Sequence, residues 1–364
     1  MQFINIANQG VKSLSPYQAG KPIEELEREL GISNIIKLAS NENPFGFPES
    51  AKQAIINQLN DLTRYPDANG FELKATISKK FGVQANQITL GNGSNDLLEL
   101  FAHTFAGEQD EIIYSQYAFI VYPLVTKAIN AVAREIPAKN WGHDLDAFFA
   151  AVSEKTKLIF IANPNNPTGN FLTEAEIDAF LAKVPANVIV VLDEAYTEFT
   201  EASERVDSFG LLAKYPNLIV SRSLSKAYGL AGLRIGYAVS NPEIADLLNR
   251  VRQPFNCNSL ALASAIAVMN DDAFVEKVAE NNRQEMQRYE AFCQGQGLDY
   301  IPSKGNFITI DFKRPAAPIY EALLREGVIV RPIAGYGMPN HLRISIGLPA
   351  ENDRLFAALV KVLG

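Results

Sequence analysis

Cysteine and histidine are scarce in this chain, and each shortage excludes a class of protein. Cys257 and Cys293 are the only cysteines among the 364 residues, too few for a disulfide framework and without metal-ligand spacing. A reducing compartment, the cytoplasm, is therefore expected. His103, His143 and His341 are scattered along the sequence, so no metal site is predicted. His103 follows an apolar stretch and is expected to pack in the core.

Basic charge and long hydrophobic runs are also lacking. Lys and Arg total 33 against 41 Asp and Glu, which gives a net charge of -8 and argues against nucleic acid as a partner. The first residues contain no basic stretch followed by an apolar one, and no run approaches the length of a membrane span. Neither export nor a membrane anchor is expected, and small-molecule partners are favoured.

The length and composition predict two globular domains. At about 150 residues per domain the chain is long enough for roughly two. Hydrophobic residues make up 47% and charged residues 20%, which are ordinary values for a folded protein. We expect a large domain at 41–255, a smaller one at 256–364, and an N-terminal arm at 1–40 that contributes to the smaller domain.

Short β-branched runs alternate with helical patterns, which is typical of an α/β protein with a mostly parallel sheet. Helices are predicted at 50–59 with Ser50 as its cap, at 94–105, and at 173–183 with Thr173 and Glu176 forming a capping box. After Val251, helices at 259–269 and 271–294 and strands at 307–311 and 342–346 predict a smaller α+β lobe. The strands of the large domain are predicted at 87–90, 111–114, 132–136, 158–162, 188–192, 218–221 and 235–239.

Four segments fall at strand ends or in glycine-rich turns, where open α/β sheets bind ligands. Residues 91–95 (Gly-Asn-Gly-Ser-Asn) end a strand and open a helix, so their amides could hold a phosphate. Residues 163–169 (Asn-Pro-Asn-Asn-Pro-Thr-Gly) form a rigid turn that could fix an amide over a ligand. An ordinary structural turn explains either segment taken alone.

The other two segments contain titratable side chains. Asp193 ends a buried strand in the run Asp-Glu-Ala-Tyr, where it could pair with a ligand or cap a helix. Lys226 lies among small residues in 223–234, after another strand. A desolvated amine loses its proton readily, which suits Schiff-base chemistry with an aldehyde. The alternative is a lysine with a buried stem and an exposed head.

Together these segments resemble the fold-type-I pyridoxal-phosphate aminotransferases, from about residue 37 to 346. Within that superfamily the chain is most similar to the histidinol-phosphate aminotransferases. The segments that carry this similarity are 14–17 (Leu-Ser-Pro-Tyr), 37–44 (Lys-Leu-Ala-Ser-Asn-Glu-Asn-Pro), 64–67 (Arg-Tyr-Pro-Asp) and 328–332 (Val-Ile-Val-Arg-Pro). The resemblance implies a mostly parallel seven-stranded sheet in the large domain, a smaller α+β domain, pyridoxal phosphate as cofactor and a homodimer.

The resemblance also implies the role of each site residue. Lys226 would form the Schiff base and then move a proton, and Asp193 would keep the pyridine nitrogen protonated. Tyr196 and Asn166 would hydrogen-bond the phenolic oxygen of the cofactor, and Tyr117 would stack on its ring. The cofactor phosphate would be held by Gly93, Ser94, Asn95, Ser223, Arg234 and the partner subunit's Tyr65. Core packing is the alternative for both Tyr65 and Tyr117.

The substrate-binding residues implied by the resemblance are Tyr17, Arg331 and Arg343. Arg343 would bind the carboxylate of glutamate or 2-oxoglutarate, and all three would share the phosphate of the imidazole substrate. A surface ion pair is the alternative for Arg331. The expected reaction is transamination between L-histidinol phosphate and 2-oxoglutarate, which gives imidazole-acetol phosphate and L-glutamate. The alternatives are an aromatic amino acid aminotransferase, a decarboxylase of a phosphorylated amino acid, and a non-catalytic sensor module.

Overall fold

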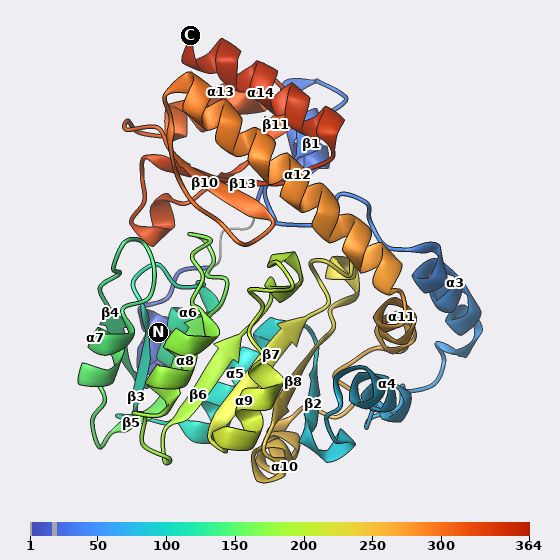
Figure 1. The fold of residues 1–364 in the computed structure, drawn as a ribbon, viewed down its shortest axis with the longest axis vertical. Helices are drawn as coiled ribbons and strands as arrows, with labels where there is room; N and C mark the ends of the chain where they lie inside the picture. The colour runs from blue at the N-terminus through green and yellow to red at the C-terminus, as the bar shows by residue number, and fades with distance from the viewer. Residues whose placement is uncertain (1, 17–19) are drawn as a thin grey trace.

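The chain folds into two lobes that meet along one broad boundary (Figure 1). The computed structural model describes residues 2–16 and 20–364. The large lobe contains the sheet and helices drawn in green, cyan and yellow, and the small lobe contains the C-terminal quarter of the chain, drawn in orange and red, together with an N-terminal segment. Within the described residues, none of the helices combines the length and apolar character needed to cross a membrane.

A seven-stranded sheet forms the centre of the large lobe, which confirms the predicted fold class. The strand order is β2-β8-β7-β6-β5-β3-β4, and all neighbours are parallel except that β8 runs antiparallel to β2 and β7. The central strands are buried along nearly their whole length because helices cover both faces. The seven strands are β2 (Ile88–Gly91), β3 (Glu111–Ser115), β4 (Val132–Ile136), β5 (Thr156–Ala162), β6 (Ile189–Asp193), β7 (Leu218–Ser223) and β8 (Gly236–Ser240).

Helices cover the sheet in two layers. One face packs against α5 (Ser94–Phe105), α6 (Val121–Ala128) and α10 (Pro242–Val251). The other face packs against α7 (Leu145–Ala150), α8 (Glu174–Leu181) and α9 (Ser208–Lys214). Each layer has its own apolar cluster, so the sheet is buried from both sides, as an α/β protein requires.

Two helix caps were predicted, and the N-termini of α8 and α3 show whether they form. Thr173 and Glu176 form the predicted capping box at the start of α8. The prediction of Ser50 as a cap is wrong, because α3 (Glu49–Gln58) already begins after the extended Pro48. The Ser50 hydroxyl instead donates to Asp271 Oδ2 at 3.2 Å.

The prediction that His103 packs in the core is also wrong. His103 lies on the solvent face of α5, where 48% of its side chain is exposed and its Nε2 lies 3.7 Å from a carboxylate oxygen of Glu99. The apolar residues before it face inward at helical spacing, and position 103 falls outside that stripe.

The small lobe is an antiparallel sheet covered by helices. Its strand order is β12-β13-β10-β9, built from β9 (Asp299–Ile301), β10 (Phe307–Asp311), β12 (Arg331–Pro332) and β13 (His341–Ser345). The long α12 (Asp272–Gln296), α13 (Ala317–Arg325) and α14 (Pro349–Leu363) share its apolar core. Strand order and helices agree with the predicted α+β lobe.

Both ends of the chain contribute to the small lobe. β1 (Ile36–Lys37) pairs in parallel with β11 (Val328–Ile329), far away in the sequence. α2 (Ile23–Leu30) packs its buried Leu26 against Leu324 and Ile329. The short α1 (Gln9–Lys12) lies instead against α6, where the Gly10 amide donates to Asn130 Oδ1 at 2.7 Å.

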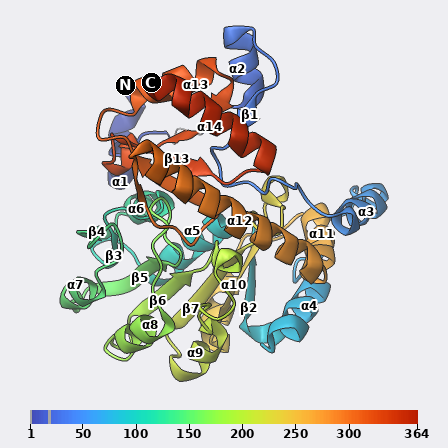
Figure 2. The ribbon, with the colours of Figure 1, turned by 45° about the horizontal axis from the view of Figure 1, so that its top comes forward.

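The position of helix α11 concerns the predicted boundary between the two domains. α11 (Ser259–Met269) packs against α3 and α4 (Phe71–Phe81), on the large-lobe side of the molecule (Figure 2). Its Ala261 and Ala265 share an apolar cluster with Leu90 of β2 and Tyr237 of β8. These contacts favour a domain boundary after Met269, later than the predicted limit at 255.

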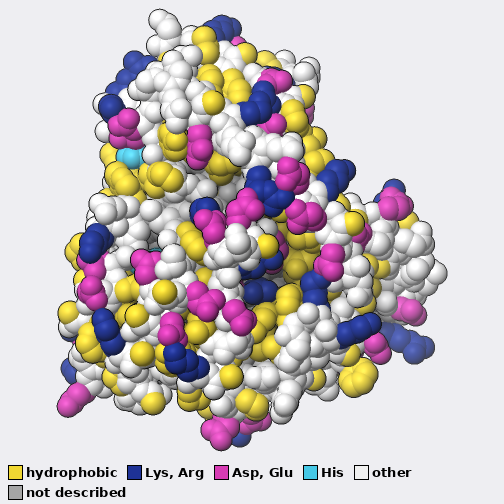
Figure 3. Space-filling view, viewed as in Figure 1, with side chains coloured by type: hydrophobic (Ala, Val, Ile, Leu, Met, Phe, Trp, Pro, Cys, Tyr) yellow, Lys and Arg dark blue, Asp and Glu magenta, His cyan; other side chains and the backbone are white. Residues whose placement is uncertain are grey.

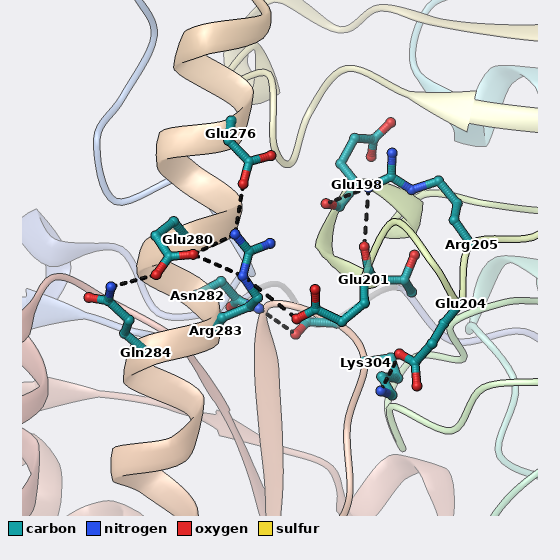
Figure 4. A network of polar contacts seen from close by, with 12 residues as sticks. Glu198, Glu201, Glu204, Arg205, Glu276, Glu280, Asn282, Arg283, Gln284 and Lys304 are labelled. Atoms are coloured by element: carbon teal, nitrogen blue, oxygen red, sulfur yellow. Dashed lines mark hydrogen bonds and ion pairs between the residues drawn. The ribbon is translucent and has the colours of Figure 1, made fainter.

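Ion pairs from α12 and from the loop before β10 join the small lobe to the large lobe, as the close view in Figure 4 shows. Arg283 of α12 lies within 2.7 Å of Glu276 on its own helix and 3.6 Å from Glu201 of the large lobe. Lys304, in the loop before β10, lies 2.5 Å from Glu204. These pairs are partly exposed, so they orient the two lobes rather than stabilise them strongly.

A buried ion pair joins the ends of β6 and β7. The guanidinium of Arg222 contacts Oε2 of Glu194 at 2.9 Å, with only 8% and 1% of the two side chains exposed. Ser208 donates to the same oxygen at 2.9 Å, and the ring of Phe209 lies 4.3 Å from the guanidinium carbon. Glu194 follows Asp193 and Arg222 precedes Ser223, so the pair fixes the two strand ends that lead into the predicted site.

Replacing Glu194 with Ala removes the carboxylate in direct contact with the buried Arg222 cation and leaves only the more distant Glu198. We expect Glu194→Ala to lower the free energy of unfolding by about 3–5 kcal/mol, measured by urea denaturation followed by circular dichroism. Asp146→Ala is the control, because Asp146 pairs with Lys183 while 86% of its side chain is exposed. Equal unfolding midpoints for the two variants would contradict the importance of the buried pair.

Candidate active site

A cavity of about 240 Å³ lies at the carboxyl ends of β5, β6 and β7, between the two lobes. Open α/β sheets bind ligands at this edge. The predicted site residues that line the cavity are Ser94, Asn95, Asn166, Asp193, Tyr196, Ser223, Lys226, Arg234, Arg331 and Arg343. Residues separated by up to 249 positions in the sequence thus surround one space, which is the size of a small organic molecule.

Lys226 follows β7 and presents its amine to the cavity. Its Nζ donates to the Ser40 carbonyl at 3.1 Å and lies 5.7 Å from the centre of the Tyr196 ring. Burial, followed by the nearby charge of Arg343, lowers the pKa of Lys226 to about 8. Near neutral pH a useful fraction of this amine is therefore unprotonated and nucleophilic.

Asp193 is the last residue of β6. Its Oδ2 accepts a hydrogen bond from the Tyr122 hydroxyl at 2.8 Å, whereas its buried Oδ1 accepts none from the described residues. Burial raises the pKa of Asp193 to about 6, and the bond from Tyr122 offsets part of that rise. A buried carboxylate with one oxygen unsatisfied fits a cationic partner such as a protonated ring nitrogen.

Tyr196 is held by a residue that the sequence reasoning did not single out. Asn41 Nδ2 contacts the Tyr196 hydroxyl at 3.0 Å, and Ser345 in turn donates to Asn41 Oδ1 at 3.1 Å. Burial, opposed in part by the charge of Arg343, raises the pKa of Tyr196 to about 12. Its phenol stays protonated and can donate a hydrogen bond into the cavity.

An anion-binding cradle lies at the start of α5. Ser94 and Asn95 begin the helix, and Gly93 precedes it with φ +83°, a conformation that favours glycine. A Cβ on Gly93 would lie 2.3 Å from the guanidinium of Arg234, so the glycine lets that cation approach the helix start. Helix amides and a guanidinium together fit a phosphate group.

Arg331 and Arg343 are direct partners across β12 and β13. Opposite residues in antiparallel strands project from the same face of the sheet, so both cations lie at one wall of the cavity. Arg343 is buried and donates to Asn166 Oδ1 and, at 2.9 Å, to the Ala39 carbonyl. Two like charges held side by side favour an anionic ligand between them.

Tyr17 lies outside the described residues. Three of the described predicted residues do not line this cavity: Gly93, which lies next to the lining guanidinium of Arg234, Tyr117 and Tyr65. The Tyr117 ring packs 5.2 Å from that of Trp141, and its carbonyl accepts a hydrogen bond from Asn165. Tyr65 is 81% exposed and stacks on Phe255 at 4.6 Å, on the outer surface of the large lobe.

The residues that contact or line the site without having been assigned to it from the sequence include Asn41, Phe119, Tyr122 and Tyr336. Asn41 lies within a segment that supported the family resemblance, so its position carried a usable signal. Tyr122 is an inward residue of α6 and looks like core packing in the sequence. No group of three or more potential metal ligands occurs within the part of the chain that the structure describes.

Comparisons with known proteins agree with this geometry. The family model described as aminotransferase class I and II matches residues 33–359. A relative from Haemophilus influenzae strain 86-028NP, named histidinol-phosphate aminotransferase 2, is 85% identical over 100% of this chain and 99% of its own length. Histidinol-phosphate aminotransferase 1 from Mannheimia succiniciproducens is 80% identical over the same shares of the two chains.

A solved structure supports the same assignment. The chain superposes with a TM-score of 0.89 on histidinol-phosphate aminotransferase from Sinorhizobium meliloti, solved in complex with pyridoxal-5'-phosphate. The two sequences are 28% identical, and the match covers 98% of this chain and 97% of the other. The matched family model, the identity to curated relatives over the whole chain and the shared fold lead to one conclusion: this chain belongs to the class I and II aminotransferase family.

Proposed function

We propose that the protein is a pyridoxal-phosphate-dependent aminotransferase that acts on L-histidinol phosphate and 2-oxoglutarate and yields imidazole-acetol phosphate and L-glutamate. The observation that carries this proposal is the pair Arg331 and Arg343 in the same cavity as Lys226. Two guanidiniums beside a nucleophilic amine suit a phosphorylated amine and a dicarboxylate in turn. The names of the relatives at 85% and 80% identity support the same substrates.

The residues around the cavity fit the cofactor. A phosphorylated pyridine aldehyde needs an amine, a carboxylate for its ring nitrogen and an anion cradle, and the cavity offers Lys226, Asp193 and the start of α5 with Arg234. The unsatisfied Oδ1 of Asp193 supports this fit. Bound there, pyridoxal phosphate would supply the electron sink that stabilises charge when a substrate bond to carbon breaks.

The roles of the site residues follow from their contacts. Lys226 binds the cofactor through its amine and, once released, moves a proton at the substrate carbon. Asp193, oriented by Tyr122, stabilises a positive charge on the ring nitrogen. Tyr196 and Asn166 donate hydrogen bonds toward the ring oxygen. Ser94, Asn95, Ser223 and Arg234 hold the cofactor phosphate, with Gly93 allowing the close approach of Arg234.

The remaining site residues serve the substrate and the partner subunit. Arg331 and Arg343, together with Tyr17, bind the substrate phosphate or carboxylate. Tyr117 stacks on the cofactor ring once the cofactor is bound. We also propose a homodimer in which Tyr65 reaches the cofactor phosphate of the neighbouring subunit. Its 81% exposure and its stacking on the partly exposed Phe255 support a surface covered by a second copy.

A cytoplasmic location completes the proposal. Cys257 and Cys293 are free and buried, which suits a reducing compartment. On the face drawn in Figure 3, acidic and basic side chains are intermingled and no broad basic area is visible, which supports small molecules rather than nucleic acid as partners.

A single-turnover absorbance assay tests the reaction. L-Histidinol phosphate, L-glutamate or L-phenylalanine is added separately to cofactor-loaded protein, and conversion to the pyridoxamine form is followed. We expect fast conversion by histidinol phosphate and glutamate and a rate at least about tenfold lower with phenylalanine, because phenylalanine has neither the phosphate of histidinol phosphate nor the second carboxylate of glutamate. Lys226→Ala is the control and shows no conversion.

The other outcomes identify the alternatives. Conversion by phenylalanine and glutamate without histidinol phosphate indicates an aromatic amino acid aminotransferase. Release of carbon dioxide from a phosphorylated amino acid, without consumption of a keto acid, indicates a decarboxylase.

The lowered pKa of Lys226 predicts how cofactor uptake depends on pH. Only the neutral amine attacks an aldehyde, so uptake of pyridoxal phosphate by the apoprotein should rise through about pH 8 and then level off. Removing the neighbouring cation in Arg343→Leu should move the midpoint to higher pH. The control Arg250→Leu alters an exposed pair on α10 and should leave the midpoint in place. A midpoint near 10.5, the ordinary value for lysine, would refute the desolvated environment.

Mixing two inactive variants tests the composite site. Tyr65→Ala and Lys226→Ala chains, dissociated and reassociated together, form mixed dimers in which one of the two sites has both residues intact. Random association should restore about one quarter of the wild-type activity, whereas each variant alone stays at its own low level. Light scattering of the same sample measures the assembly, and a mixture no more active than its parts would rule out a shared site.

A further inference from the structure

Tyr336 lies on a turn of the small lobe that enters the cavity. The turn joins β12 to β13 and contains a short 3-10 helix, Ala334–Tyr336, closed by Gly337 in the left-handed region at φ +76°. The Gly337 amide donates to the Ala334 carbonyl at 2.9 Å. The turn is thus a closed, hydrogen-bonded unit that holds Tyr336 in a defined position.

The Tyr336 side chain contributes to the wall of the site. It packs on an apolar cluster of Ile301, Ile333 and Met338 and lines the same cavity as Lys226. Burial is the main cause that raises the pKa of Tyr196 to about 12, and charge on the Tyr336 phenol is one of the smaller causes. The phenol therefore lies within electrostatic range of the buried tyrosine that contacts the cofactor position.

The other aromatic side chains that line the cavity have roles already. Tyr196 contacts Asn41 and faces the cofactor position. Phe119 packs edge-on against Tyr122, 6.0 Å between ring centres, on the large lobe. Among the described lining residues, Tyr336 is the aromatic one that lies between Arg331 and Arg343 in the sequence, in the turn that joins their two strands.

We propose that Tyr336 binds the imidazole ring of the substrate and determines specificity for that half of the reaction, an inference that rests on the proposed function. A phosphate bound by Arg331 and Arg343 would lie on the strand pair from which the turn with Tyr336 extends, and all three side chains line one cavity. A phenol offers both a ring face for stacking and a hydroxyl that pairs with either imidazole nitrogen. Glutamate has no ring and needs neither contact.

Two substitutions separate these contributions. In single-turnover titrations, Tyr336→Leu should weaken the apparent affinity for L-histidinol phosphate by about ten- to a hundredfold, since both stacking and a hydrogen bond are lost. Tyr336→Phe should lose about two- to tenfold, because only the hydroxyl is removed. For L-glutamate both variants should stay within about threefold of wild type, and competition by inorganic phosphate, which needs only the arginines, should not change.

Tyr300→Leu is the matched control. Tyr300 is another partly buried tyrosine of the small lobe, on β9, and it does not line the cavity. The same chemical change there should leave both substrates unaffected. Equal losses for histidinol phosphate and glutamate in Tyr336→Leu would show a structural role, and no loss for either would show that the ring binds elsewhere.

The wild-type titration comes first, because it separates the two ideas. If wild-type protein does not convert histidinol phosphate, the proposed function fails and this inference falls with it. If wild type converts it and Tyr336→Leu keeps the wild-type ratio of the two affinities, only the role of Tyr336 fails.

Discussion

The backbone register of three neighbouring strands is the constraint on which the site depends. Ala162 of β5 pairs with Asp193 of β6, and Asp193 pairs with Ser221 of β7. Three separate turns therefore leave the sheet along one line, and each supplies different chemistry: an amide, a carboxylate and an amine. Parallel strands allow this because their carboxyl ends meet at one edge. The buried pair of Glu194 and Arg222 fixes the same strand ends from the opposite face of the sheet.

Burial in the site shifts the pKa values of a basic and an acidic side chain in opposite directions. Burial makes the Lys226 amine a weaker base and the Asp193 carboxyl a weaker acid, so each is shifted toward its neutral form. A ligand with a positive nitrogen and a negative phosphate offers an opposite charge to buried groups of the site: its nitrogen can pair with the Asp193 carboxylate, and its phosphate with the start of α5 and Arg234. Arg331 and Arg343 form a second site for a negatively charged group, at the wall where the substrate is proposed to bind.

Much of this could be predicted from the sequence, for identifiable reasons. Six strands of the large sheet could be predicted because they are short, mostly buried apolar runs, as expected for strands covered on both faces. The edge strand β4 is exposed at four of its five residues, and its β-branched composition was the remaining signal. The polar segments were found because each follows a buried run. Features that depend on packing between distant segments were missed. In the sequence, Tyr122 is indistinguishable from a core tyrosine, and α3 begins after Pro48 rather than at Ser50. The packing of α11 on the large lobe rests on contacts that no local pattern reveals. The exposure of Tyr65 could not be foreseen either, since its motif says nothing about the surface around it.

The pairing of β1 with β11 has a consequence for how the protein is made. During synthesis the large sheet can close once β8 has left the ribosome, because all of its strands lie before Ser240. The segment around Ile36 must remain without its partner strand until Val328 emerges. The small lobe is thus completed only after an early segment of the nascent chain has met a late one, and the wall that contains both arginines is completed with it.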